Sequence, residues 1–138
     1  MNDIYRIAEA ETGLTPEEIK SALLASLEGR SLKKVLILPP DFTRFHSNAG
    51  YITNVYYHAL TERGVQVDIM PALGTHVPVT EAQWNAMFGD VPFERMLVHN
   101  WRTDVVKLGE IPAEFISEIT EGLWTESVAC EVNRLVMD

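Results

Sequence analysis

An acidic and a basic side chain lie three residues apart in the stretch Pro40-Asp41-Phe42-Thr43-Arg44. An arginine held beside an aspartate has a fixed orientation, and its remaining donors can bind a carboxylate or a phosphate. The functional interpretation is therefore a small-anion site in which Arg44 binds the ligand, with Thr43 as an additional candidate. The structural alternative is that Asp41 caps the loop and Arg44 is a surface charge.

A second candidate is the histidine in Gly74-Thr75-His76, which follows an apolar, strand-like segment and precedes a helix start. A histidine titrates near neutral pH, which suits proton transfer or metal binding. Gly74 permits a tight turn or the close approach of a ligand, and Thr75 offers a hydroxyl group. The alternative is that His76 is a solvated loop residue without a chemical role.

A third polar pair, His99-Asn100, follows another short apolar segment. If the three preceding segments are parallel strands, all three clusters lie at the carboxyl edge of one sheet, where open α/β sheets bind their ligands. His46 and His99 could join His76 in a metal site, but no HxxxH or HxH pair is present to indicate one. We therefore expect no metal ligands within this chain.

The composition is that of a water-soluble globular protein and argues against binding to nucleic acid. Twenty acidic residues against eleven basic ones give a net charge of −9, and phosphate neutralisation requires clustered Lys and Arg. The single cysteine, Cys130, cannot form an internal disulfide, which suits a reducing compartment. With no signal-peptide pattern and no long apolar run, we expect a cytoplasmic protein without membrane association.

Helices and strands are predicted to alternate along most of the chain. Thr15-Pro16-Glu17-Glu18 combines a capping threonine, a first-turn proline and a glutamate at the third helical position. Short apolar runs predict strands, and longer amphipathic segments closed by glycine predict helices. The predicted helices span residues 16 to 29, 49 to 63, 80 to 88 and 112 to 120, and the predicted strands 34 to 38, 65 to 70, 96 to 99, 105 to 108 and 127 to 132.

This alternation predicts an α/β fold with a mostly parallel sheet and helices on both faces, a Rossmann-like three-layer domain. Residues 1 to 138 are long enough for one domain with a hydrophobic core and too short for two. The strand at residues 34 to 38 is expected to be buried on both faces. The apolar last residues, without a cap or polar tail, suggest that the chain is the front part of a longer protein.

Two motifs in this order and at this spacing resemble the N-terminal domain of the nickel-pincer lactate racemase family (LarA-like). They are Pro40-Asp41-Phe42-Thr43-Arg44 and the stretch from Leu73 to Glu81, LGTHVPVTE. The resemblance extends to the Gly64 turn, Val98-His99-Asn100 and Glu131-Val132-Asn133-Arg134, and so covers about residues 30 to 138.

The resemblance implies an enzyme that racemises or epimerises 2-hydroxy acids. The family uses a nickel-pincer nucleotide as hydride acceptor and donor, while a histidine takes the proton of the substrate hydroxyl. By motif match, His76 corresponds to one of two acid/base histidines, Arg44 to the residue that holds the substrate carboxylate, and Asp41 to the acidic partner that orients the site.

This chain departs from the family in what it lacks and in two neighbours of the motifs. The family's second catalytic histidine, cofactor-anchoring lysine and nickel-binding histidine would all follow Asp138, and none of the chain's lysines matches the anchor. Phe45 and Val77 stand where the family commonly has a proline-like and a basic residue, so the substrate need not be lactate.

Three hypotheses follow from these patterns. The first is the front, substrate-contacting part of a racemase, inactive alone, whose partners are a small 2-hydroxy acid and a missing downstream domain. The second is a stand-alone α/β module that binds a small anion through Asp41, Arg44 and His76 without catalysis. The third is a structural domain in which the polar clusters do not converge.

Overall fold

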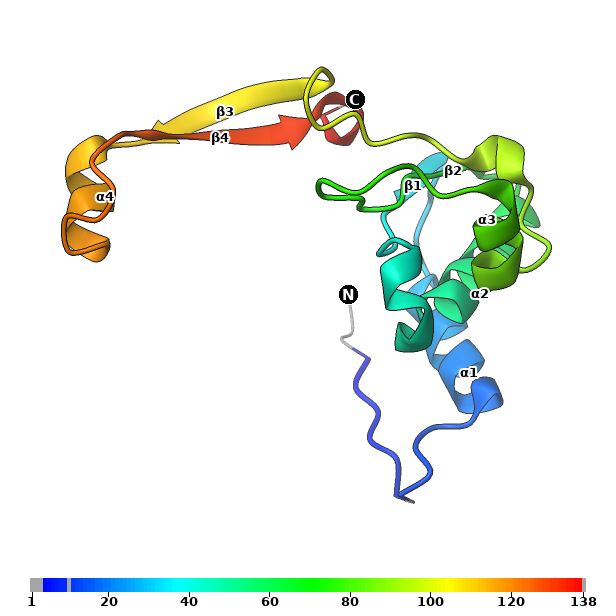
Figure 1. Ribbon diagram of the computed structural model, residues 1–138. Coiled ribbons are helices and arrows are strands. Elements are labelled where there is room, and N and C mark those ends of the chain that lie inside the picture. Colours follow the sequence, from blue (N-terminus) through cyan, green and yellow to red (C-terminus); the bar gives the residue numbers. More distant parts are fainter. Residues whose placement is uncertain (1–3, 10, 138) are drawn as a thin grey trace. The chain divides into compact units, whose positions relative to one another are not determined.

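The computed structural model describes residues 4 to 9 and 11 to 137, whose contacts form two compact units (Figure 1). The first unit ends at Val98 and the second begins at His99. Each unit contains its own two-stranded sheet. The expectation of a single domain over residues 1 to 138 stays a prediction, because two contact units can belong to one folding domain.

The first unit places helices around a pair of parallel strands (Figure 1). Its first two α-helices, and the strand that precedes the second motif, were predicted with nearly the bounds that the structure shows. In chain order its elements are α1 (Pro16–Ser26), β1 (Lys34–Ile37), the 3-10 helix η1 (Phe42–Ser47), α2 (Ala49–Thr61), β2 (Gln66–Ile69), α3 (Glu81–Phe88) and the 3-10 helix η2 (Phe93–Arg95).

Two of these helices begin at reciprocal caps, and the sequence predicts the one at Thr15. At α1 the Thr15 hydroxyl accepts from the Glu18 backbone N–H at 3.2 Å, and the Glu18 carboxylate accepts from the Thr15 N–H at 2.7 Å. At α3, Thr80 and Gln83 make the same exchange at 3.3 and 3.0 Å. Each cap satisfies backbone donors that have no partner within the helix, and so sets where the helix begins.

The core of the first unit lies on one face of its sheet. The parallel register places Val35 beside Val67 and Ile37 beside Ile69, and all four side chains belong to or pack against the core. The opposite face pairs Lys34 with Gln66 and Leu36 with Asp68. The predicted burial of β1 on both faces is therefore wrong: Lys34 is exposed, and the other three residues of β1 are only partly buried.

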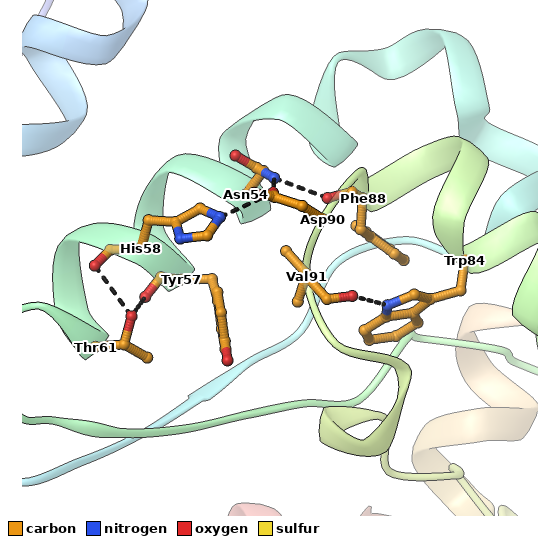
Figure 2. Close-up of polar contacts among 8 residues, drawn as sticks. All are labelled: Asn54, Tyr57, His58, Thr61, Trp84, Phe88, Asp90 and Val91. Carbon is orange, nitrogen blue, oxygen red and sulfur yellow. Dashed lines mark hydrogen bonds and ion pairs between the residues drawn. The ribbon is translucent and has the colours of Figure 1, made fainter.

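Trp84 anchors the contact between α3 and the loop that follows it (Figure 2). Its side chain is fully buried, and its indole N–H donates to the Val91 carbonyl at 2.7 Å. On α2, the Asn54 amide donates to the Phe88 carbonyl and to Asp90, each at 2.8 Å, and ties the two helices together. These bonds satisfy polar groups in and beside the core, where an unpaired donor would be destabilising.

Helices α2 and α3 approach closely at Gly50. A Cβ atom at this position would lie 2.0 Å from the Met87 carbonyl oxygen, a backbone atom that cannot move aside cheaply. Because only glycine lacks a Cβ atom, Gly50 permits this separation of the two helices.

The strand predicted at residues 96 to 99 is not formed. Only one parallel bridge, between Ile69 and Met96, continues the sheet, with the Leu97 N–H donating to the Ile69 carbonyl at 2.8 Å. The segment is bounded by η2 on one side and by a turn on the other, in which the Asp104 N–H donates to Asn100. The segment therefore contributes a single bridge to the sheet and no ladder.

The second unit is an antiparallel ribbon whose strands are connected through a helix (Figure 1). Its elements are β3 (Val105–Ile111), α4 (Ala113–Ile119), β4 (Val128–Asn133) and the 3-10 helix η3 (Arg134–Val136). The ladder shifts register between Lys107 and Gly109, so that Leu108 forms a bulge. The two strands and the helix were predicted, but as additions to one parallel sheet.

The fold is therefore mixed α/β, with one parallel and one antiparallel pair of strands. The predicted three-layer, Rossmann-like arrangement is not found within the described residues. It failed because apolar runs predict strands without predicting their partners or direction. No helix in the part of the chain that the structure describes is both long and apolar enough to cross a membrane.

Candidate active site

The first two polar clusters lie together at the carboxyl ends of β1 and β2, as the sequence predicts. The parallel ladder extends past both strands through a bridge between Pro40 and Ala72, and the Ala72 N–H donates to the Pro39 carbonyl at 2.8 Å. The residues that follow this bridge on the two segments are Asp41 and Leu73. Because the strands run in the same direction, the loops that follow them begin side by side.

Asp41 is a buried carboxylate with three hydrogen-bond donors around it. Its Oδ1 accepts from the Thr43 hydroxyl at 2.5 Å and from the Thr43 backbone N–H at 3.1 Å. Its Oδ2 lies 2.5 Å from Nδ1 of His76. Burial raises the pKa of Asp41, but the hydrogen bonds from Thr43 and His76 outweigh it, so the pKa lies below its ordinary value. The carboxylate is therefore ionised at neutral pH.

His76 is held at the surface by its loop and by Asp41. Gly74 adopts a left-handed conformation with φ of 58°, and the His76 N–H donates to the Leu73 carbonyl at 3.0 Å, which closes the turn. Non-glycine residues are strained in this conformation, so Gly74 is needed for the turn. The His76 side chain remains 55% exposed, although its Nδ1 faces a buried carboxylate.

This pair has the arrangement of a histidine oriented for proton transfer. An ionised Asp41 can only accept a hydrogen bond, so Nδ1 carries the proton and donates to it, and the neutral ring has its lone pair on Nε2. A carboxylate in this position also stabilises the ring when Nε2 receives a proton. With the ring half exposed, Nε2 can take a proton from a small molecule and return it.

Arg44 does not pair with Asp41, although their spacing in sequence allows it. The Arg44 backbone N–H donates to the Asp41 carbonyl at 3.0 Å, but the Asp41 side chain binds Thr43 and His76 instead. The guanidinium is exposed and has no hydrogen-bond or ion-pair partner among the described residues. The Arg44 backbone is therefore fixed to Asp41, and its guanidinium is available to a ligand.

The two threonines of the motifs have different surroundings. Thr43 makes two hydrogen bonds to Asp41 and so helps to fix the carboxylate that faces His76. Thr75 is exposed in the turn, and its hydroxyl has no partner among the residues that the structure describes. Only Thr43 therefore has a structural link to the pair.

His99 belongs to the second unit, where it contacts the end of β4. The side-chain oxygen of Asn133 accepts from the Leu135 N–H at 2.9 Å. Its side-chain NH₂ group donates to Nδ1 of His99, also at 2.9 Å. Asn133 is buried, and this pair connects the turn after Val98 to the end of the ribbon. The described contacts thus assign His99 a structural partner within its own unit.

Comparison with known proteins places the chain in a family. The sequence profile of the lactate racemase N-terminal domain matches residues 11–137, almost the whole chain. The chain belongs to this family. A crystal structure of a Thermotoga maritima protein is similar, with a TM-score of 0.82 and 29% sequence identity over 97% of this chain. No match is found among proteins with curated descriptions.

The lactate racemase N-terminal domain described here spans 33% of the length of the Thermotoga maritima chain. Its described residues contain no group of three or more His, Cys, Asp or Glu that could hold a metal ion. Lys34 lies at the opposite end of β1 from Asp41, and Lys107 pairs with Glu110 in the other unit.

The lactate racemase motifs thus located the rim of the site, but not its main contact. The sequence suggested an Asp41–Arg44 pair, whereas the structure pairs Asp41 with His76, 35 residues away. The available signal was that both residues follow strands predicted to be adjacent and parallel. The Asn133–His99 contact had no such signal, because nothing in sequence placed those two segments together.

Proposed function

We propose that this chain is the N-terminal, substrate-contacting part of a cytoplasmic racemase or epimerase of 2-hydroxy acids. The observation that carries the proposal is the Asp41–His76 hydrogen bond at the carboxyl ends of two parallel strands, beside the exposed Arg44. Membership of the lactate racemase family supplies the reaction class.

In this proposal each of three side chains has a separate role. Arg44 binds the substrate carboxylate, because a guanidinium offers paired donors that match two carboxylate oxygens. His76 would take the proton of the 2-hydroxyl group at Nε2 and give a proton back, while the nucleotide held by the downstream domain would supply the hydride acceptor and donor that inversion at C2 requires. Asp41 is a positioning residue that accepts from Nδ1 and so directs Nε2 toward the substrate.

The remaining parts of the reaction are assigned to a downstream domain. The chain matches a third of the length of its solved relative, and its described residues contain no cluster of three or more His, Cys, Asp or Glu that could hold a metal ion. We therefore propose that the downstream domain holds the nickel-pincer nucleotide and a second acid/base histidine. The 138-residue chain alone should bind substrate weakly and should not turn over.

The substrate role of Arg44 can be tested by titrating the chain with D- and L-lactate and following backbone and imidazole NMR signals. We expect shifts at residues 41 to 46 and 74 to 77. Arg44→Gln should raise the apparent Kd by about tenfold or more, because it removes a charge-assisted hydrogen-bond pair. Arg95→Gln, at another exposed arginine of the same unit, is the matched control and should leave the Kd within about twofold.

Two outcomes would contradict this assignment. If lactate shifts NMR signals only in other parts of the chain, and the Arg44→Gln protein binds lactate like the unchanged protein, then Arg44 is not part of the site. Sustained inversion of lactate by the 138-residue chain with added nickel nucleotide, but without a downstream domain, would show that the division of roles is wrong.

A non-catalytic module that binds a small anion is the second candidate function. It is favoured by one observation, the Arg44 guanidinium that has no partner within the described part of the chain. Inorganic phosphate distinguishes the two functions: binding at least as tight as that of lactate, and unaffected by His76→Gln, supports the module. Loss of lactate selectivity in His76→Gln supports the racemase.

A further inference from the structure

The strand β1 has an unpaired edge although it has the composition of a central strand. Within the described residues it pairs on one side only, with β2. The run Lys34-Val35-Leu36-Ile37-Leu38 is apolar after its first residue, and its next residues lead directly to Asp41. Apolar runs of this kind are typical of interior strands of parallel sheets, because edge strands usually carry charges or proline.

An apolar groove of about 430 Å³ lies along β1, and no described residue of β2 lines it. Its wall is formed by the strand and by side chains of α1, α2 and the loop between α1 and β1, among them Leu27, Leu32 and Tyr56. Leu38 is 49% exposed and Leu32 is 37% exposed at this groove. Large apolar side chains left in water beside an unpaired strand are a surface for another strand.

The backbone of β1 shows which groups are available to such a strand. The carbonyl groups of Lys33, Ile37 and Pro39 accept from the β2 side, at 3.0, 2.9 and 2.8 Å. Because backbone groups alternate in direction along a strand, those of Leu36 and Leu38 face the other edge. A strand that pairs here would bind these two residues and cover the groove.

We propose that the free edge of β1 is the docking site for an apolar β-strand that belongs to the downstream domain of a racemase-type chain. The inference deepens the proposed function and rests on its downstream domain. The Thermotoga maritima relative supports the occupant, since it contains this fold within a chain three times as long, of which 33% is matched. A parallel strand added at β1 would end beside Asp41 and build the second wall of the crevice there.

The test uses two proteins, the 138-residue chain and a hybrid in which it replaces the matched third of the Thermotoga maritima protein. Amide hydrogen exchange is followed residue by residue. In the chain alone, the amides of Leu36 and Leu38 should exchange fast and those of Val35 and Ile37 slowly. In the hybrid, exchange at Leu36 and Leu38 should slow by about 100-fold or more, while Val35 and Ile37 serve as internal controls.

A second format removes the dependence on a folded hybrid. The chain is mixed with the unmatched part of the Thermotoga maritima protein as a separate polypeptide, and the same amides are followed. Protection of Leu36 and Leu38 in either format supports the inference, and protection in neither overturns it. Protection that appears in the chain alone as its concentration rises would assign the edge to a second copy and would also overturn it.

Failure of this inference can be told apart from failure of the proposed function. Protection at β1 in a hybrid that neither binds nor inverts a 2-hydroxy acid would leave the docking site in place and refute the reaction. Inversion that depends on His76, in a hybrid whose Leu36 and Leu38 amides remain unprotected, would refute the docking site and leave the reaction in place.

Discussion

The two units of the chain differ in how their helices and strands pack together. In the first, α2 and α3 pack on the sheet around a fully buried Trp84 and Phe88. In the second, Ile116 and Asn133 are the only described residues that are buried. A two-stranded ribbon without a covering layer is marginally stable in water. The comparison shows that regular hydrogen bonding is present in both units, but a hydrophobic core in only one.

The ribbon nevertheless has one apolar and one charged face, as does a sheet that buries one of its faces. On one face Val106 lies opposite Val132 and Ile111 opposite Val128, with Cys130 between them. On the other face Lys107 lies opposite Glu131 and pairs with Glu110. Such alternation is typical of an antiparallel sheet with one solvated face. The sequence thus encodes an apolar face on this ribbon, which α4 of the same unit does not pack across.

The largest expected difference between the units concerns their tryptophans. Trp84→Ala should lower the free energy of unfolding of the first unit by about 3–5 kcal/mol, because it empties a fully buried position. Trp124→Ala, at a side chain that is 53% exposed in the second unit, should change it by less than about 0.5 kcal/mol. Urea denaturation followed by circular dichroism measures both. Equal effects would show that the second unit has a comparable core.

Glycines test the same difference through packing. Gly50→Ala places a Cβ atom 2.0 Å from the Met87 carbonyl oxygen and should cost about 1–3 kcal/mol through forced separation of α2 and α3. Gly109→Ala meets no atom within 4 Å and has no left-handed backbone, so its effect should stay within about 0.5 kcal/mol. Thermal unfolding of the two variants is the measurement. A Gly50→Ala protein as stable as the unchanged chain would contradict the close helix contact.

The site predicts a pH dependence that belongs to the first unit. Because the pKa of Asp41 is lowered on folding, its contribution to stability is present above the unfolded pKa of about 3.9 and is lost as pH falls through the folded value. Asp41→Asn should therefore lower stability at pH 7 by about 1–3 kcal/mol and weaken its acid dependence. Urea denaturation between pH 2 and 7 tests this.

Glu114→Gln, at an exposed carboxylate on α4, is the control for that experiment. It should leave the pH dependence of unfolding of the first unit unchanged. An Asp41→Asn protein with the acid dependence of the unchanged chain would mean that the Asp41–His76 bond is not maintained in solution.

The smallest effect is expected on the charged face of the ribbon. The hydrogen bond to the Glu110 carboxylate raises the pKa of Lys107, and both side chains are about half exposed. Exposed pairs contribute little, since water and salt screen them. Lys107→Gln should leave the unfolding midpoint unchanged within error, at low and at high salt. A clear, salt-sensitive loss would show that this pair is shielded from solvent by another part of the protein.

Much of the local structure could be predicted because its causes are local. The capping residues Thr15 and Thr80 and their partners three positions later set the starts of α1 and α3. Shared strand direction similarly predicted that Asp41 and His76 lie at one rim. The prediction failed where the partner was distant: Asp41 binds His76 rather than the nearby Arg44, and residues 96 to 99 form one bridge rather than a strand.

The sequence by itself determined where the helices begin, most of the short strands and the membership of a lactate racemase-type family, because hydrogen bonds within a few residues and ordered motifs decide these. Only the tertiary structure decided that β3 and β4 pair with each other, that the core covers one face of β1 and β2, and that His76 meets Asp41. The physical reason is that strand pairing and burial join segments tens of residues apart, and apolar patterning specifies a face without naming what covers it.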